Sequence, residues 1–357
     1  MFTDKTLRRL FVLPACGALA LGALAPAAGG FTRAHASGGP RNGASNYQCA
    51  KRPLGAATDY NVFILGDATQ YNSDTQGRLA VGGNATLTNY SVGATLGSFV
   101  GDALVVGGNL TLNSVAVHYG NAAYGGTLTQ SKVTFPEGGS FRQGSPLNFT
   151  KAGADLQSLS RDYASLQTNG TTTVQGGFIT LTGTNARLNV FSVSGSAVSS
   201  ANGLSINVPA GSTVLVNVDG SSDQIANAGF ANLTGVSFDH VLFNFYQATS
   251  LTLSNTTVAG SILAPSAAIN FQPSLTTGAL IGASLYSGGQ NNGGQNNGGQ
   301  NNGGQNNGGQ NNGGQNNGGQ NNGGQNNGGQ NNGGQANTTP FTGCLPKFQG
   351  LNQGGQG

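Results

Sequence analysis

The stretch Val81-Gly82-Gly83-Asn84-Ala85-Thr86-Leu87 recurs 25 residues later as Val106-Gly107-Gly108-Asn109-Leu110-Thr111-Leu112. This period matches one coil of a β-solenoid, in which successive coils stack on one another. The Gly-Gly and Asn positions fit sharp corners between short strands, where a positive φ is needed and a side chain would clash. The repeated stretch therefore predicts a β-solenoid.

Short apolar runs that alternate with polar residues and end at Gly or Asn continue from residue 55 to 287, which is long enough for one sizeable core. A β-sandwich predicts much the same strands and remains the alternative. The runs expected to form strands include 79–81, 85–88, 104–106, 178–182, 188–193, 204–208, 214–218, 241–246, 251–253, 258–263 and 279–285.

One segment has a different period. Leu156, Leu159, Tyr163 and Leu166 recur at helical spacing within residues 152–167. We expect one accessory amphipathic helix that ends at Asn169-Gly170 and packs its apolar stripe on the side or end of the β body.

The amino terminus has the three parts of a secretory signal. Basic residues including Arg8 and Arg9 precede an apolar stretch, and Ala34-His35-Ala36 closes it. We expect a signal peptide over residues 1–36 with cleavage after Ala36, whether export uses the general or the twin-arginine route, and then a polar lead over residues 37–54. The apolar stretch is broken by Pro and Gly, and no later segment is apolar enough to cross a membrane.

The formal charge of +3 belongs entirely to this signal, so the mature chain has 10 basic and 10 acidic residues. Without a basic excess, nucleic acid is excluded as a partner. Charged residues make up only 7% of the chain. That composition is typical of a secreted β protein rather than of an enzyme.

A second zone begins at Gly288, where Gly-Gly-Gln-Asn-Asn repeats run to Asn332. These repeats hold no apolar side chain to bury, so we expect a disordered linker over residues 288–335 and a C-terminal segment over residues 336–357. Cys49 and Cys344 lie on either side of the β region and the linker, and in an exported protein we expect them to pair. An intermolecular cross-link or two free thiols are the alternatives.

Several motifs carry a family resemblance. They are Asp59-Tyr60-Asn61-Val62-Phe63-Ile64-Leu65-Gly66-Asp67 near the start, and Leu242-Phe243-Asn244-Phe245-Tyr246 and Gly260-Ser261-Ile262-Leu263-Ala264-Pro265 near the end. They resemble the choice-of-anchor A family of bacterial surface proteins. The resemblance implies an exported, adhesin-like domain without catalytic residues. The usual C-terminal anchor is not recognisable after Cys344, so the resemblance does not predict covalent attachment.

The sequence holds few groups of residues that could catalyse a reaction or bind a metal ion. His118 and His240 are the only histidines of the mature chain, no zinc spacing or nucleophile elbow occurs, and Asp219 and Asp223 fit a turn. We therefore predict no catalytic residues and no cofactor. Asp67, Asn72 and Asp74 are close enough in sequence to supply oxygen ligands to calcium, although a structural role in turns competes with that interpretation.

The predicted function is an adhesin or structural protein at the cell surface or in the extracellular matrix. Its β surface would bind a macromolecular partner, namely a matrix protein, a glycan or another copy of itself. A carbohydrate-binding or carbohydrate-active β-helix is the alternative. Ice binding is a further alternative, and it requires that Thr-x-Thr pairs align into ranks. The pairs are Thr86/Thr88, Thr127/Thr129, Thr171/Thr173 and Thr180/Thr182.

Overall fold

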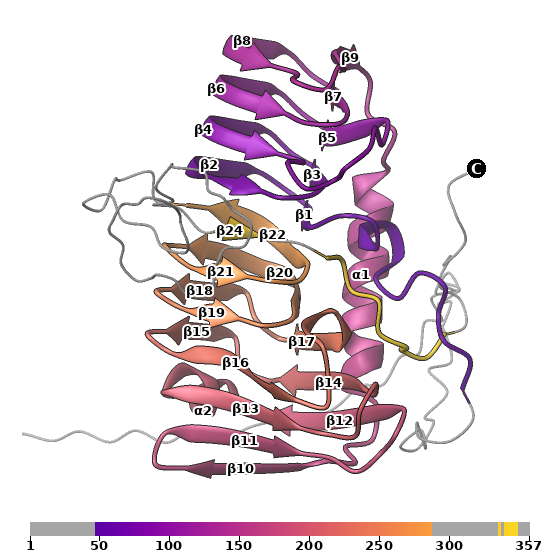
Figure 1. The fold of residues 1–357 in the computed structure, drawn as a ribbon, viewed down its shortest axis with the longest axis vertical. Coiled ribbons are helices and arrows are strands. Elements are labelled where there is room, and N and C mark those ends of the chain that lie inside the picture. Colours follow the sequence, from indigo (N-terminus) through magenta and orange to yellow (C-terminus); the bar gives the residue numbers. More distant parts are fainter. Residues whose placement is uncertain (1–46, 288–334, 337–338, 349–357) are drawn as a thin grey trace, which may run out of the picture. The chain divides into compact units, whose positions relative to one another are not determined.

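The computed structural model describes residues 47–287, 335–336 and 339–348, which belong to one compact unit. The predicted signal peptide with Ala36, the lead up to residue 46 and the repeat from 288 to 334 lie outside the described residues. The described chain forms a β-solenoid of parallel strands with one long helix beside it (Figure 1).

The first run of strands climbs from the middle of the solenoid to one end (Figure 1). Each strand pairs in parallel with the strand two places later, so Val81 lies opposite Val106 and Ala85 opposite Leu110. The 25-residue repeat is therefore one coil, as predicted. The strands are β1 (Val62–Ile64), β2 (Ala68–Thr75), β3 (Leu79–Val81), β4 (Ala85–Val92), β5 (Asp102–Val106), β6 (Leu110–Val117), β7 (Asn121–Tyr124), β8 (Leu128–Thr134) and β9 (Phe141–Gln143).

Helix α1 (Phe149–Ala164) then carries the chain back along the solenoid, and a second run climbs from the opposite end (Figure 1). This run ends where the first began, because β22 pairs with β1 through Leu280 and Val62. Its strands are β10 (Thr171–Gln175), β11 (Phe178–Thr182), β12 (Leu188–Val193), β13 (Gly203–Asn207), β14 (Thr213–Val218), β15 (Ser222–Ala226), β16 (Gly229–Thr234), β17 (Val241–Phe245), β18 (Ser250–Ser254), β19 (Thr257–Val258), β20 (Ser261–Phe271), β21 (Leu275–Thr276) and β22 (Leu280–Tyr286).

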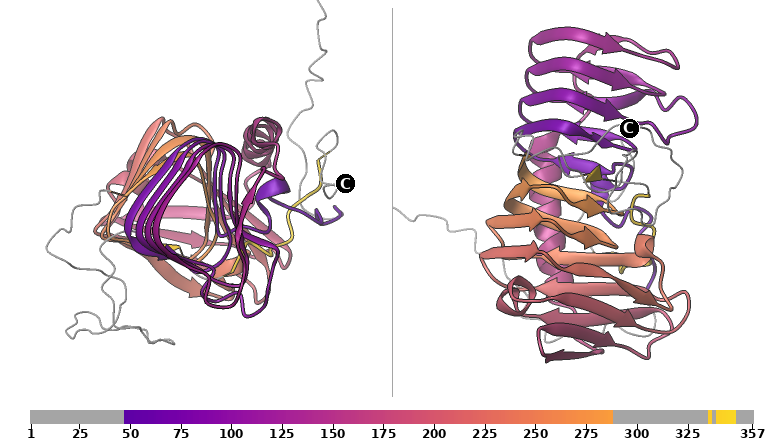
Figure 2. Two further views of the ribbon diagram at one scale, coloured as in Figure 1. Left: turned by 90° about the horizontal axis from the view of Figure 1, so that it is seen from above. Right: turned by 60° about the vertical axis from the view of Figure 1, so that its left-hand side comes forward.

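The coils enclose an apolar core and present three sides, seen along the stack in Figure 2. The helix side is formed by β12, β14, β17, the start of β20, the start of β22, β1, β3, β5, β7 and β9. Apolar residues pointing outward on this side, such as Phe63, Leu215 and Leu242, pack under Leu156, Leu159 and Tyr163 of α1. The helix side is therefore covered.

The chain beyond the repeat returns to the solenoid. The third side is formed by β10, β11, β13, β16, β19, β21, β24 (Gln335–Ala336) and the second halves of β2, β4, β6 and β8. Strand β24 pairs there in parallel with β21 and β2, and so joins the two runs. Residues 339–348 then pack beside residues 47–50, with Phe341 and Leu345 buried. Cys344 and Cys49 form a disulfide, so the predicted pairing is confirmed.

Parallel pairing decides between the two predicted architectures. Only β10 and β11 form an antiparallel pair of strands among the described residues, so the β-sandwich alternative is wrong and the β-solenoid is confirmed. The predicted helix begins three residues earlier than expected, because the Asn148 side chain accepts from the Lys151 amide and caps it. Three short helices were not predicted: α2 (Gly195–Ser199), η1 (Gly55–Ala57) and η2 (Phe238–His240).

Candidate binding surface

One side of the solenoid carries outward residues in register across eight strands, and we call it the polar face. Its strands are β15, β18, the end of β20, the end of β22 and the first halves of β2, β4, β6 and β8, several of which are visible at the left of Figure 1. Strand pairing aligns one outward residue from each strand into a single rank. The rank reads Gln224, Thr252, Asn270, Tyr286, Thr69, Thr86, Thr111 and Thr129.

Each half of the face also carries a second column parallel to this rank, two residues before it along the strands of the lower half and two residues after it along those of the upper half. It consists of Ser222, Ser250, Ala268 and Ser284 on the lower half, and of Tyr71, Thr88, Asn113 and Ser131 on the upper half. No residue of the rank or of this column is charged. At the usual strand separation, eight strands span about 34 Å.

The inward residues of the same strands explain why the face holds its shape. Leu87, Leu112, Leu251 and Leu253 alternate with the outward positions and are buried in the core. Hydrogen bonds between parallel strands fix the register, since a one-residue slip would expose these leucines. The outward hydroxyl and amide groups are therefore held at fixed spacings.

Asparagine side chains fasten the corners on both edges of the polar face. At one edge Asp67 Oδ1 accepts from the Asn84 amide at 2.7 Å, and Asn84 Oδ1 accepts from the Asn109 amide at 3.0 Å. At the other edge Asn72 and Asn89 both have a positive φ, and Asn89 Nδ2 donates to Asn72 Oδ1 at 2.8 Å. These ladders hold neighbouring corners in line.

The residues proposed for calcium are therefore found at different places. Asp67 lies at one corner, Asn72 at the next, and Asp74 is buried on the third side beside Gln76. Asp67 and Asn72 each bind a neighbouring coil. Among the described residues no group of three or more His, Cys, Asp or Glu side chains is placed to hold a metal ion. Calcium at Asp67, Asn72 and Asp74 stays a prediction.

The structure places the four Thr-x-Thr pairs on different parts of the solenoid. Thr86 and Thr88 belong to the polar face, and Thr129 continues the rank on β8, whereas Thr127 lies at the corner before that strand. Thr171 and Thr173 lie opposite Thr182 and Thr180 in the β10–β11 hairpin, on the third side. Thr69 and Thr111, which complete the rank, were missed because their neighbours at i+2 are Tyr71 and Asn113.

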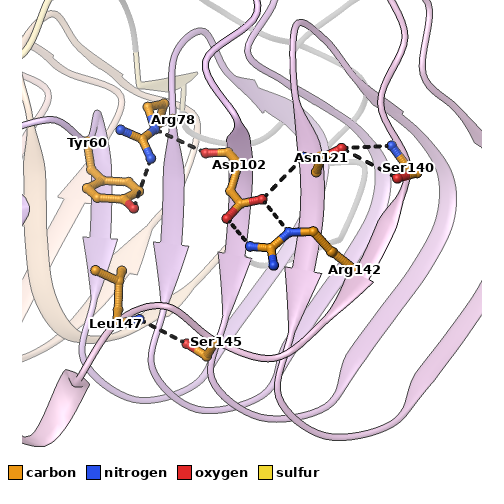
Figure 3. Close-up of polar contacts among 8 residues, drawn as sticks. All are labelled: Tyr60, Arg78, Asp102, Asn121, Ser140, Arg142, Ser145 and Leu147. Atoms are coloured by element: carbon orange, nitrogen blue, oxygen red, sulfur yellow. Dashed lines mark hydrogen bonds and ion pairs between the residues drawn. The ribbon is translucent and has the colours of Figure 1, made fainter. Parts of the chain in front are cut away.

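A charged cluster lies across the first strands of the helix side (Figure 3). The Arg142 guanidinium donates to both carboxylate oxygens of Asp102, at 3.1 and 2.5 Å, and Arg78 Nε donates to the Asp102 carbonyl oxygen at 3.1 Å. Arg78 also stacks on the Tyr60 ring, 4.5 Å from its centroid. Each charged side chain of the cluster bonds a group in another coil, so the cluster fastens the stack.

Four further acidic side chains are bonded to neighbouring groups. Asp59 binds Arg52, Asp155 binds Lys151, and Glu137 lies 3.0 Å from His118 Nδ1. Burial opposes ionisation of Asp239, but hydrogen bonds from the Ser237 and Thr342 hydroxyls outweigh it and lower the Asp239 pKa below its usual value. Asp239 thereby holds the segment that contains Cys344.

No helix in the described part of the chain is long and apolar enough to span a membrane. No curated protein matches the chain. A family model described as "Putative Ice-binding-like adhesive domain" matches residues 53–296. The crystal structure of an ice-binding protein from an Antarctic ascomycete, Antarctomyces psychrotrophicus, is similar at 17% sequence identity. That alignment covers 65% of this chain and 92% of the ascomycete chain, with a TM-score of 0.29.

Proposed function

We propose that this chain, which belongs to the family of ice-binding-like adhesive domains, is an exported adhesive protein whose polar face binds an ordered surface, with ice as the first candidate. One observation carries the proposal, namely the register of uncharged outward residues across eight strands. The adhesive family supports the predicted adhesin-like character, and the match does not name the choice-of-anchor A family. Membership of that second family remains part of the proposal.

A regular face suits a regular ligand. Parallel strands repeat every 4.7–4.9 Å and outward residues recur every second position, so the hydroxyls form a two-dimensional array. Threonine is β-branched and has a restricted χ1, so its hydroxyl and methyl group lose little freedom on binding. Many weak contacts at fixed spacing then add through their effective concentration.

The test is uptake of the purified protein into slowly growing ice. Thr86→Tyr together with Thr111→Tyr places two rings above the rank without touching the core, and we expect a severalfold fall in the fraction taken up. Thr182→Tyr is the matched control, because Thr182 is an exposed strand residue on the third side. Wild-type protein that ice excludes as fully as serum albumin would contradict ice binding.

A glycan is the second candidate, and the aromatic residues of the polar face favour it. Tyr286 is 52% exposed and pairs with Thr69, and Tyr71 lies on the same face two residues further along β2. Exposed tyrosine rings present a broad apolar face that suits sugar rings. Retention on insoluble polysaccharide that falls with Tyr71→Ala and Tyr286→Ala, but not with Thr86→Tyr, would select this ligand.

Export and lack of catalysis are parts of the same proposal. The predicted signal peptide, cleaved after Ala36, directs the chain out of the cytoplasm. The disulfide supports an oxidising compartment. The pairing of Asp102 with Arg142 and of Glu137 with His118 supports a protein that binds without turnover. Mature protein recovered from the medium or envelope should begin at Ser37.

A further inference from the structure

One buried carboxylate lies on the inner side of the polar face. Asp223 belongs to β15, between the outward residues Ser222 and Gln224, and it is only 5% exposed. Its strand neighbour on β18 is Leu251, a core residue. Its Oδ2 atom has no hydrogen-bond partner among the described residues. An ionised carboxylate in such a place is unfavourable unless it is compensated.

A second carboxylate lies beside it. Burial raises the pKa of Asp223, and the negative charge of Asp219 raises it further. Asp219 follows β14, and its Oδ1 accepts from the Gly195 amide at 2.9 Å, where α2 begins. Two acidic groups therefore share one corner of the solenoid.

Several oxygen atoms converge at this corner. A Cβ atom on Gly195 would overlap both Asp223 Oδ1 and the Asp219 carbonyl oxygen, so these two oxygens border the same small space. Gly220, with φ +105°, lies against the Asp223 carboxylate and donates its amide to Gln247 Oε1 at 3.1 Å. The corner therefore gathers oxygens from two neighbouring coils, next to the Gly195 amide of a third.

A proton and a cation are the two ways to compensate this charge. A proton on Asp223 would neutralise it but would leave Oδ2 without a described hydrogen-bond partner. A hard divalent cation would bind the free carboxylate oxygen, Asp219 and the carbonyl oxygen together. We propose that Asp219 and Asp223 bind a calcium ion, with the Asp219 carbonyl oxygen as a further ligand and water completing the shell.

The experiment compares thermal unfolding of the disulfide-intact protein in 10 mM CaCl2 and in EDTA. Extracellular calcium modules have dissociation constants of about 10⁻⁴–10⁻³ M. Binding in that range would raise the ratio of folded to unfolded protein roughly 10–100-fold, a shift of about 3–8 °C in Tm. Asp223→Asn should abolish the shift, and in EDTA it should be more stable than wild type because a buried charge is removed.

A control variant and a luminescence measurement test the calcium site further. Asp67→Asn is the control, since Asp67 is the sequence-predicted calcium candidate, and it should keep the full shift. Terbium added to the wild-type protein should luminesce when tyrosine is excited, because Tyr246 and Asp219 directly follow the paired residues Phe245 and Val218. Equal Tm values in calcium and EDTA, or a shift that survives Asp223→Asn, would overturn the site. Ice or glycan binding is measured separately and does not depend on it.

Discussion

Among single residues, the first glycine of each Gly-Gly corner sets how closely the coils of the first run can approach. The Gly107 amide donates to the Val81 carbonyl oxygen at 2.8 Å, and the Gly125 amide donates to Val106 at 2.9 Å. A Cβ atom on Gly107 would overlap the Gly82 carbonyl oxygen in the coil below. The clash would be with backbone, which cannot move without separating two coils.

Gly107→Ala is therefore expected to lower the free energy of unfolding by roughly 2–4 kcal/mol, as overpacking at a rigid site does. Gly229→Ala is the matched control, because a Cβ there meets nothing within 4 Å and the Gly229 φ is not positive. Urea denaturation followed by circular dichroism measures both. Equal stabilities of the two variants would show that the corner does not limit the approach of the coils.

At the level of elements, a buried amide network joins α1 to the helix side. Asn244 on β17 is fully buried, and its Nδ2 donates to the Ser160 carbonyl oxygen and to Asn217 Oδ1, both at 2.8 Å. Its Oδ1 accepts from the Ser160 hydroxyl at 2.6 Å, and Asn217 Nδ2 donates to the Tyr163 carbonyl oxygen. The network fixes the position of the helix on an otherwise apolar surface.

Asn244→Ala should cost about 2–4 kcal/mol of unfolding free energy, because it leaves the Ser160 and Asn217 groups buried without partners. Asn232→Ala, at an exposed strand position on the third side, should change stability by less than about 0.5 kcal/mol. Thermal and urea unfolding measure both variants. A small effect at Asn244 would mean that water replaces the lost amide.

The sequence predicts local elements well because their signals are local. Period two marked the strands, helical spacing marked α1, and the repeated Gly-Gly-Asn stretch gave the coil length. The order of the coils was not predictable, since the pairing of Leu280 with Val62 joins distant segments whose strands look alike. The rank of the polar face could not be predicted without this order, because Tyr286 lies opposite Thr69 only where the second run of coils stacks on the first. Asp223 was interpreted as a turn residue, whereas it lies in β15, because residues 222–226 hold too few apolar side chains to predict a strand.

In the whole molecule, the repeat interrupts one corner of one coil. Ser287 follows the strand position opposite Asn270, and Gln335 lies opposite Leu275, so the 47 residues from 288 to 334 stand where the neighbouring coil has residues 272–274. Strand β24 and the disulfide lie beyond the repeat and belong to the solenoid. The predicted boundary between the linker and the C-terminal segment, between residues 335 and 336, falls inside β24. A two-residue Gln-Ala strand has no pattern from which it could be predicted.

Replacing residues 288–334 by a three-residue Asn-Gly-Ser corner should therefore preserve the fold. A shorter connection costs less loop-closure entropy, so the free energy of unfolding should stay equal or rise by up to roughly 2 kcal/mol. The matched control removes residues 288–336 with the same corner, which deletes β24 and leaves the edges of β21 and β2 unpaired where the two runs join. We expect this control to be clearly less stable in urea denaturation. If both deletions unfold the protein, the repeat itself supports the solenoid, whereas if both are harmless, β24 contributes nothing to joining the two runs.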